Sequence, residues 1–197
     1  DQQIFFGRDA DIDRLFERVL GTQLLVLFGK SGLGKTSLLM AGLFPKLRKE
    51  KPLLPVPIRV NGPGSPAEII IAAVTESCRR AGAELTSGNT AGVWEFLRSS
   101  LIWSGDLLLT PVLVFDQFEE IFTLRDTEFR TSLASELGAL ASGIPPERLR
   151  AAEGTRTEPG ARLGEQPPQV KILLSLREEY LGTLQELTVA IPGLFQE

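Results

Sequence analysis

The sequence predicts a single α/β domain built on a parallel β-sheet. The first observation is a set of nearly uninterrupted apolar runs over 24–28, 111–116 and 170–176, which are typical of strands covered on both faces. The second is that amphipathic helical stretches separate these runs. The third is a glycine-rich turn, Gly29 to Thr36, directly after the first run. With 197 residues, 43% of them hydrophobic, the chain has enough apolar material for one compact core.

The first half of the chain alternates between predicted helices and strands. Apolar residues at helical spacing predict an amphipathic helix over 12–20, beside the first strand. A second helix follows the glycine-rich turn, and we expect it to loosen at Gly42 and Pro45. Residues 53–60 favour β-structure but contain two prolines, which a sheet tolerates mainly at an edge. This segment is therefore predicted to be the edge strand.

The middle of the chain contains a complete helix-start signal. Ser65 is a predicted N-cap, Pro66 suits the first helical position, and Glu68 completes a capping box, so we expect a helix as far as Gly82. Apolar residues at helical spacing predict a further helix over 90–103.

The last third of the chain is predicted to hold short helices around the final strand. A helical turn is expected over 119–124, and Asp126 is expected to cap the helix after it. Over 143–169 the composition shifts to Pro, Gly, Glu and Arg, which predicts an insertion loop with the composition of a disordered segment. Residues 178–187 are predicted to be helical.

Composition excludes several classes of function. The net charge of −4 and the absence of a Lys/Arg cluster argue against nucleic acid as a direct partner. The single cysteine, Cys78, excludes an internal disulfide, and the absence of histidine removes the commonest metal ligand and general base. No apolar run approaches the roughly 20 residues that cross a bilayer, so no membrane partner is expected. We expect a cytoplasmic piece of a longer protein, since the chain begins at Asp1.

The glycine-rich turn has the pattern and the context of a phosphate-binding loop. Its sequence is Gly29-Lys30-Ser31-Gly32-Leu33-Gly34-Lys35-Thr36, followed by Ser37. Glycines let consecutive backbone N–H groups turn around a phosphate, and the N-terminus of the following helix adds partial positive charge. Lys35 is then expected to reach the β- and γ-phosphates, and Thr36 to offer its hydroxyl to Mg²⁺.

Two further strands are predicted to deliver charged groups to the same edge of the sheet. Asp116 follows four apolar strand residues and is the expected partner of Mg²⁺, through water, opposite Thr36; the alternative is an acid that caps the next turn. Arg177 ends the last strand and is a candidate sensor of the γ-phosphate. Its alternative is a surface ion pair with Glu178 or Glu179.

Hydrolysis needs a carboxylate that orients the attacking water. The candidates are Glu119 and Glu120, and the residues alone do not decide between them. Gln117 directly follows Asp116 and cannot act as a base, which favours either slow turnover or a base three or four residues further along.

Four segments together resemble the STAND class of signalling NTPases, in particular its bacterial novel STAND subgroup, which shares an AAA+-related fold with NACHT and NB-ARC proteins. The segments are 5–11, the phosphate loop, 112–122 and 173–177. The resemblance covers almost the whole chain, which makes residues 1–197 an NTPase core. It implies a three-layer α/β/α P-loop NTPase fold of the ASCE type, with strand order 2-3-4-1.

The resemblance also implies residue roles and cofactors. ATP or ADP with Mg²⁺ would bind, with Gly7 and Arg8 against the nucleotide. The phosphate loop would be the Walker A motif, Asp116 the Walker B acid and Arg177 the sensor 1 residue. The chain departs from the family in three respects: Asp11 replaces the usual glutamate, the residues after Arg177 are unusually acidic, and the insertion over 143–169 is longer than expected.

At the level of the whole protein, the resemblance implies a nucleotide-dependent switch. Sensor and effector domains would flank this module, and exchange of ADP for ATP would drive homo-oligomerisation in defence or cell-death signalling. The family's fifth strand, helical lid and winged helix would follow position 197, leaving the first strand at an exposed edge. Two alternatives stay open: a P-loop kinase, which would need a lid, and a nucleotide-binding scaffold without turnover.

Overall fold

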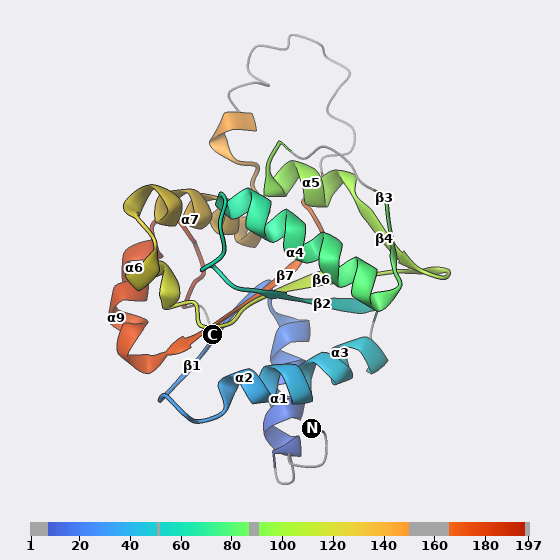
Figure 1. Cartoon of the computed structure of the whole chain (residues 1–197), viewed down its shortest axis with the longest axis horizontal. Helices are drawn as coiled ribbons and strands as arrows, with labels where there is room; N and C mark the ends of the chain where they lie inside the picture. The colour runs from blue at the N-terminus through green and yellow to red at the C-terminus, as the bar shows by residue number, and fades with distance from the viewer. Residues whose placement is uncertain (1–7, 51, 87–90, 150–165, 196–197) are drawn as a thin grey trace.

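Four parallel strands form the central sheet of the computed structural model, which describes residues 8–50, 52–86, 91–149 and 166–195. Their order across the sheet is β1-β7-β6-β2 (Figure 1). The strands are β1 (Leu24–Gly29), β2 (Leu53–Ile58), β6 (Thr110–Phe115) and β7 (Lys171–Arg177). Numbered in chain order, the four strands read 2-3-4-1 from the β2 edge. The proline-containing β2 therefore lies at one edge, and the partly exposed β1 at the other.

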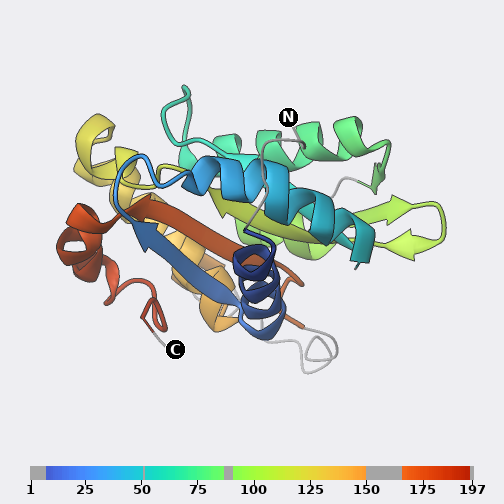
Figure 2. The same ribbon diagram turned by 90° about the horizontal axis from the view of Figure 1, so that it is seen from below.

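Helices cover both faces of the sheet (Figures 1 and 2). One face packs against α1 (Asp9–Gly21), η2 (Leu38–Leu43) and α3 (Phe44–Glu50), and the other against α4 (Pro66–Ala81), α5 (Val93–Ser99) and α7 (Thr127–Ser142). Successive residues of β6 divide between the two cores, because side chains alternate along a strand: Val112 and Val114 join the first, Leu113 and Phe115 the second. The arrangement is three-layered, α/β/α.

The helix after the glycine-rich turn is continuous but changes its winding. It begins as α2 (Lys35–Ser37), widens into the π-helical η2 and ends as α3. The loosening predicted at Gly42 and Pro45 takes the form of this wider stretch, which includes Gly42 and ends two residues before Pro45, a residue without an N–H donor. Gly42 is also needed for packing, because a Cβ there would lie 2.6 Å from the Cδ1 of Ile12 on α1.

The predicted caps are confirmed. Ser65 accepts a hydrogen bond from the N–H of Glu68, whose carboxylate in turn accepts from the N–H of Ser65 at 2.7 Å. Asp126 accepts from the N–H of Phe129 at 2.8 Å and starts α7. These side-chain bonds satisfy backbone donors that the first turn of a helix leaves free.

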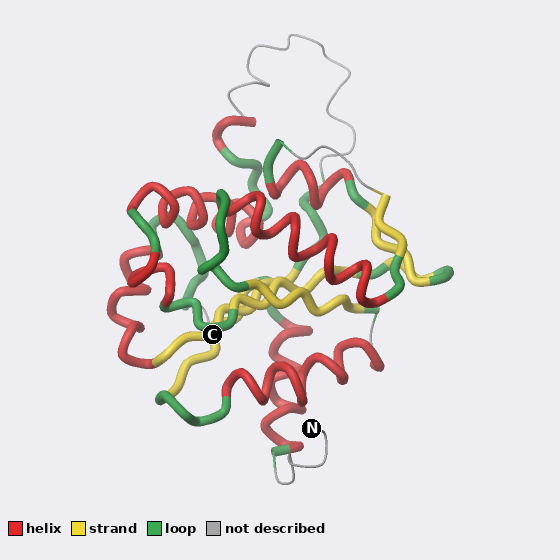
Figure 3. The backbone as a smooth tube through the Cα atoms, viewed as in Figure 1, coloured by secondary structure: helices red, strands yellow, loops and turns green. Residues whose placement is uncertain are grey.

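The helix predicted over 90–103 is wrong in its second half. Position 90 lies outside the described residues, α5 ends at Ser99, and the chain then enters a second, antiparallel sheet with order β3-β4-β5 (Figure 3). Its strands are β3 (Glu84–Thr86), β4 (Leu101–Ser104) and β5 (Leu107–Leu108). The cause is the dipeptide Gly105-Asp106 between two apolar runs, a hairpin signal in which Gly105 adopts a φ of 58°.

The C-terminal part of the described chain lies beyond the carboxyl ends of the strands. The short helix expected over 119–124 is α6 (Glu120–Leu124). The helix expected over 178–187 is broken into η3 (Glu178–Tyr180), α9 (Leu181–Leu184) and η4 (Gln185–Leu187). Of the insertion predicted over 143–169, residues 150–165 lie outside the described residues. None of the helices described is long and apolar enough to cross a bilayer.

Candidate functional site

The phosphate loop joins the carboxyl end of β1 to α2. Gly32 and Gly34 have φ values of 80° and 74°, in the left-handed region that residues with a side chain rarely adopt. These two glycines let the chain reverse tightly and enter the helix at Lys35. The helix N-terminus therefore faces the site that the loop encloses, which suits an anion.

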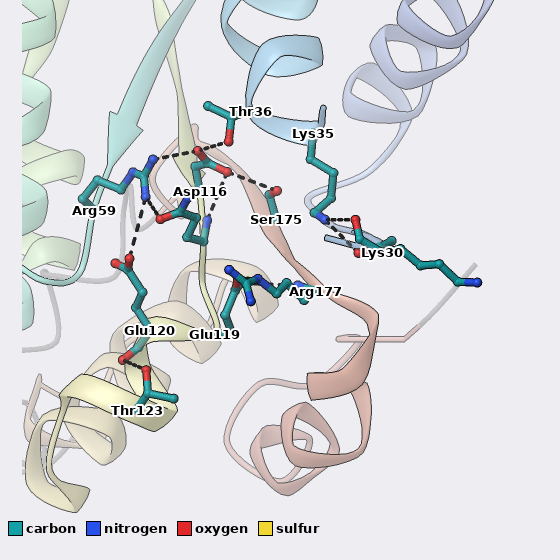
Figure 4. Close-up of polar contacts among 12 residues, drawn as sticks. Lys30, Lys35, Thr36, Arg59, Asp116, Glu119, Glu120, Thr123, Ser175 and Arg177 are labelled. Atoms are coloured by element: carbon teal, nitrogen blue, oxygen red, sulfur yellow. Dashed lines mark hydrogen bonds and ion pairs between the residues drawn. The ribbon is translucent and has the colours of Figure 1, made fainter. Parts of the chain in front are cut away.

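Lys35 lies inside its own loop. Its ammonium group donates to the carbonyl oxygens of Gly29 at 2.7 Å and Lys30 at 3.0 Å, whereas the side chain of Lys30 extends away from the site (Figure 4). An ammonium group has three N–H donors, so one remains available for a phosphate oxygen. The two lysines of the loop thus have different positions, and only Lys35 points into the pocket.

Asp116 is the best-connected acid of the site. It is only 3% exposed, and both of its carboxylate oxygens accept hydrogen bonds. Oδ2 accepts from Thr36 Oγ1 at 2.8 Å and Arg59 Nη2 at 3.1 Å; Oδ1 accepts from the Gln117 N–H at 3.1 Å and Ser175 Oγ at 3.4 Å (Figure 4). Donors to both oxygens satisfy the hydrogen-bonding capacity of this buried carboxylate and fix its orientation.

The contact between Thr36 and Asp116 brings together the two predicted metal-binding residues. A hydroxyl and a carboxylate are hard oxygen donors of the kind that Mg²⁺ prefers. No group of three or more acidic, His or Cys side chains gathers anywhere in the described chain, so a cation here would take its remaining ligands from water and phosphate. The donor set fits Mg²⁺ bound together with a nucleotide.

Glu119 and Arg177 form an ion pair at the rim of the same site. Nε of Arg177 lies 3.2 Å from Oε1 of Glu119, and the backbone N–H of Arg177 donates to Oε2 at 3.3 Å. The glutamate is 7% exposed, whereas about half of the arginine side chain is exposed. Arg177 therefore pairs with Glu119 and not with Glu178 or Glu179, the alternative that the sequence offered.

Glu120 faces a different neighbour. Figure 4 shows its side chain directed toward Arg59, with 3.9 Å between Oε1 and Nη1 of the arginine. Its other oxygen, Oε2, is buried and has no hydrogen-bond partner among the described residues. The two candidate bases are thus separated: Glu119 pairs with Arg177 at the site, whereas Glu120 pairs with Arg59.

A pocket of about 210 Å³ connects these groups. It is lined by Ser31, Gly32, Gly34, Lys35, Thr36, Asp116, Gln117, Glu119, Ser175 and Arg177. Of the remaining predicted loop residues, Leu33 and Ser37 are exposed at its margin. The backbone of Gln117 has a φ of 58°, unusual for a residue with a side chain, and its amide oxygen accepts a hydrogen bond from Arg59.

Arg8 lies against the phosphate loop. Its Nη1 donates to the carbonyl oxygen of Leu33 at 2.7 Å and comes close to Gly34. This contact places Arg8, the residue directly before α1, beside the phosphate loop. Gly7, predicted to share this position, lies outside the described residues.

Two residues of the site were missed by the sequence reasoning. Arg59 directly follows β2, and Ser175 is a fully buried hydroxyl within β7. The same rule that selected Asp116 and Arg177, a polar group where a strand ends, applies equally to Arg59. For Ser175 the sequence gives a weaker signal, which is a single polar residue within the apolar run 170–176.

The chain matches a known protein family. The family model described as Novel STAND NTPase 1 matches residues 1–192. A search of curated proteins found no match.

Proposed function

The chain belongs to the Novel STAND NTPase 1 family, and we propose that it binds ATP or ADP with Mg²⁺ at the carboxyl ends of β1, β6 and β7. Membership of an NTPase family implies nucleotide binding. The proposal adds that the base is adenine and that Mg²⁺ binds with the nucleotide. The observation that carries it is the 2.8 Å contact between Thr36 and Asp116, with the Lys35 ammonium in the adjoining loop.

Each residue of the pocket has a role in this proposal. The backbone of residues 29–36 and the Lys35 ammonium hold the phosphates, and Arg8 holds the loop from outside. Thr36 and Asp116 hold Mg²⁺, which neutralises phosphate charge when bound. Hydrogen bonds from Thr36 and Ser175 hold the Asp116 carboxylate beside the phosphate loop, where a metal would need it.

We further propose that ATP hydrolysis is slow and uses Glu119. This is the candidate carboxylate that lines the pocket, where it can orient a water molecule. Its ion pair with Arg177 occupies the Oε1 atom of Glu119, which becomes available to a water molecule when the guanidinium moves. Gln117, the neighbour of Asp116, has an amide that cannot accept a proton.

In the full-length protein, the module would act as a switch. With ATP bound, the Arg177 guanidinium would leave Glu119 and contact the γ-phosphate; with ADP bound, it would stay paired with Glu119. The two nucleotides would therefore stabilise different conformations at the end of β7. Flanking sensor and effector domains would respond to this difference, and homo-oligomerisation would follow. The proposed setting is cytoplasmic signalling in defence or cell death, without direct nucleic-acid binding.

Calorimetric titration of the chain with ADP, ATP and GTP, each with Mg²⁺ and with EDTA, tests the nucleotide site. We expect binding of the adenine nucleotides, strengthened by Mg²⁺, and weaker binding of GTP. Chromatography of the supernatant after denaturation would identify any nucleotide that copurifies. No binding of any of the three nucleotides would overturn the proposal.

A nucleotide-binding scaffold without turnover is the second candidate, and the Glu119–Arg177 ion pair favours it. Phosphate release from ATP over hours distinguishes the two, because a scaffold retains ATP unchanged. The kinase alternative needs a lid over the pocket, and the segment expected to supply it, 143–169, falls largely outside the described residues. Transfer of phosphate to a metabolite would select that alternative.

A further inference from the structure

Arg59 is a second arginine at the carboxyl ends of the strands, and the functions assigned above do not use it. It follows β2 directly, and the N–H of Asp116 donates to the carbonyl oxygen of Ile58, so the ends of β2 and β6 are held together. Its guanidinium faces three acceptors between the end of β6 and the start of α6: Asp116, Gln117 and Glu120. Its position is therefore set by the sheet register.

Arg59 and a divalent cation would use the same atom. Nη2 of Arg59 donates to Oδ2 of Asp116, the oxygen that also accepts from Thr36. A metal held between Thr36 and Asp116 would meet the positive charge of the guanidinium close by, and like charges in a partly buried site repel. The metal and Arg59 therefore compete for Asp116.

Glu120 offers Arg59 a second acceptor. Its Oε1 already lies 3.9 Å from the guanidinium, and its Oε2 is buried without a hydrogen-bond partner among the described residues. A buried carboxylate oxygen without a donor is costly, and a bidentate arginine pair would satisfy it. About 40% of the Arg59 side chain is exposed, so it can shift without being buried further.

We propose that Arg59 is a positioning residue that pairs with Asp116 in the metal-free site and moves to Glu120 when a divalent cation binds. The proposal rests on the nucleotide and metal site proposed above. It assigns Glu120 the role of second acceptor and not that of a base. The exchange makes metal affinity depend on two residues that line neither the phosphate loop nor the pocket.

Mn²⁺ titration of the ADP complex, followed by loss of the sharp electron paramagnetic resonance signal of free Mn²⁺, tests the exchange. Arg59→Gln is expected to lower the Kd for Mn²⁺ about tenfold, because a screened unit charge beside the metal is removed. Glu120→Gln is expected to raise it about threefold, because the guanidinium loses its alternative partner. ADP affinity in EDTA is expected to change less than about twofold in both variants, since neither side chain lines the loop.

Two variants serve as controls. Arg59→Lys keeps a positive charge beside Asp116 and should bind Mn²⁺ within about threefold of the unsubstituted chain. Arg80→Gln removes the same charge from α4, where Arg80 pairs with Glu76 at 2.6 Å, and should leave Mn²⁺ affinity unchanged. Circular dichroism establishes that each variant is folded.

Unchanged or weaker Mn²⁺ binding in Arg59→Gln, in a protein that still binds ADP, would overturn the exchange and leave the nucleotide site intact. If Arg59→Gln does not fold, Mn²⁺ affinity in Glu120→Gln equal to that of the unsubstituted chain would overturn the exchange instead. An unsubstituted chain that does not bind ADP would overturn the nucleotide site itself.

Discussion

Arg177 and Glu119 hold each other through two contacts, one from the guanidinium Nε at 3.2 Å and one from the backbone N–H at 3.3 Å. The backbone contact fixes the carboxylate at the end of β7 even when the guanidinium moves. A phosphate near Arg177 would compete with Glu119 for the guanidinium. Glu119 would then keep its hydrogen bond from the Arg177 N–H but lose the ion pair. In the function proposed above, the pair would link recognition of a terminal phosphate to the release of a base.

Hydrolysis should therefore depend on Glu119 and not on Glu120. Glu119→Gln keeps the shape and can still accept from the Arg177 N–H, but removes the carboxylate, and we expect ATP turnover to fall by about 100-fold or more. Glu120→Gln should reduce turnover less than about threefold at saturating Mg²⁺, because Glu120 lies outside the pocket. Phosphate release under multiple turnover measures both. Equal losses in the two variants would contradict the assignment of Glu119.

The phosphate loop provides a matched pair of lysines. Lys35→Ala removes the ammonium that lies within the loop, and we expect ATP and ADP affinity to fall by about 100-fold or more, as for loss of a charge-assisted contact. Lys30→Ala removes an equal charge from a side chain that extends away, and should change affinity less than about threefold. Calorimetric titration of the two variants gives the comparison. A loss of similar size in Lys30→Ala would mean that net charge, not position, decides binding.

The parts of the fold that were predictable from sequence are those set by local chemistry. Buried strands appear as apolar runs, and the caps at Ser65 and Asp126 are fixed by residues three positions apart. The strand β4 was missed because Leu101 continues the helical spacing of Val93, Trp94 and Leu97. In the sequence, the Gly105-Asp106 dipeptide is the signal that distinguishes a β-hairpin from a longer helix.

The site was predictable where a motif fixes it and not where strand register does. Lys35 and Thr36 belong to a contiguous pattern, and Asp116 follows an apolar run. Arg59 reaches Asp116 because the ladder pairs Ile58 with Phe115, a relationship between residues 57 positions apart in sequence. The distinction between Glu119 and Glu120 likewise depends on the tight turn after β6, in which Gln117 has a positive φ.

Gly138 on α7 is expected to be essential for stability. A Cβ at this position would overlap the carbonyl oxygen of Ala190, part of the segment that packs back onto α7. Gly138→Ala should lower the free energy of unfolding by about 1–3 kcal/mol, since a backbone atom cannot rotate away. Gly182→Ala on α9, where a Cβ meets nothing within 4 Å, should instead be neutral or stabilise by about 0.5–1 kcal/mol. Urea unfolding of both variants measures the difference, and a neutral Gly138→Ala would contradict this packing.

Because of Glu136, the protein should become less stable as the pH rises above the ordinary pKa of a glutamate side chain. The side chain is 6% exposed on α7; one oxygen lies 3.0 Å from Arg148 and the other has no partner among the described residues. Burial raises the pKa of Glu136 above 4.5, and Arg148 only partly offsets it. Between 4.5 and the raised value, the folded protein binds more protons than the unfolded chain. The free energy of unfolding therefore declines with pH in that window, by up to about 1.4 kcal/mol per pH unit.

Glu136→Gln should remove this decline, because an amide of the same shape carries no titrating proton. Urea unfolding from pH 4.5 to pH 6.5 should give a flatter dependence for Glu136→Gln than for the unsubstituted chain. Glu128→Gln, at an exposed position in the first turn of the same helix, should keep the original slope. If Glu136→Gln and the unsubstituted chain have equal slopes, Glu136 is charged in the folded protein throughout this range. In that case the ion pair with Arg148 outweighs the cost of burial.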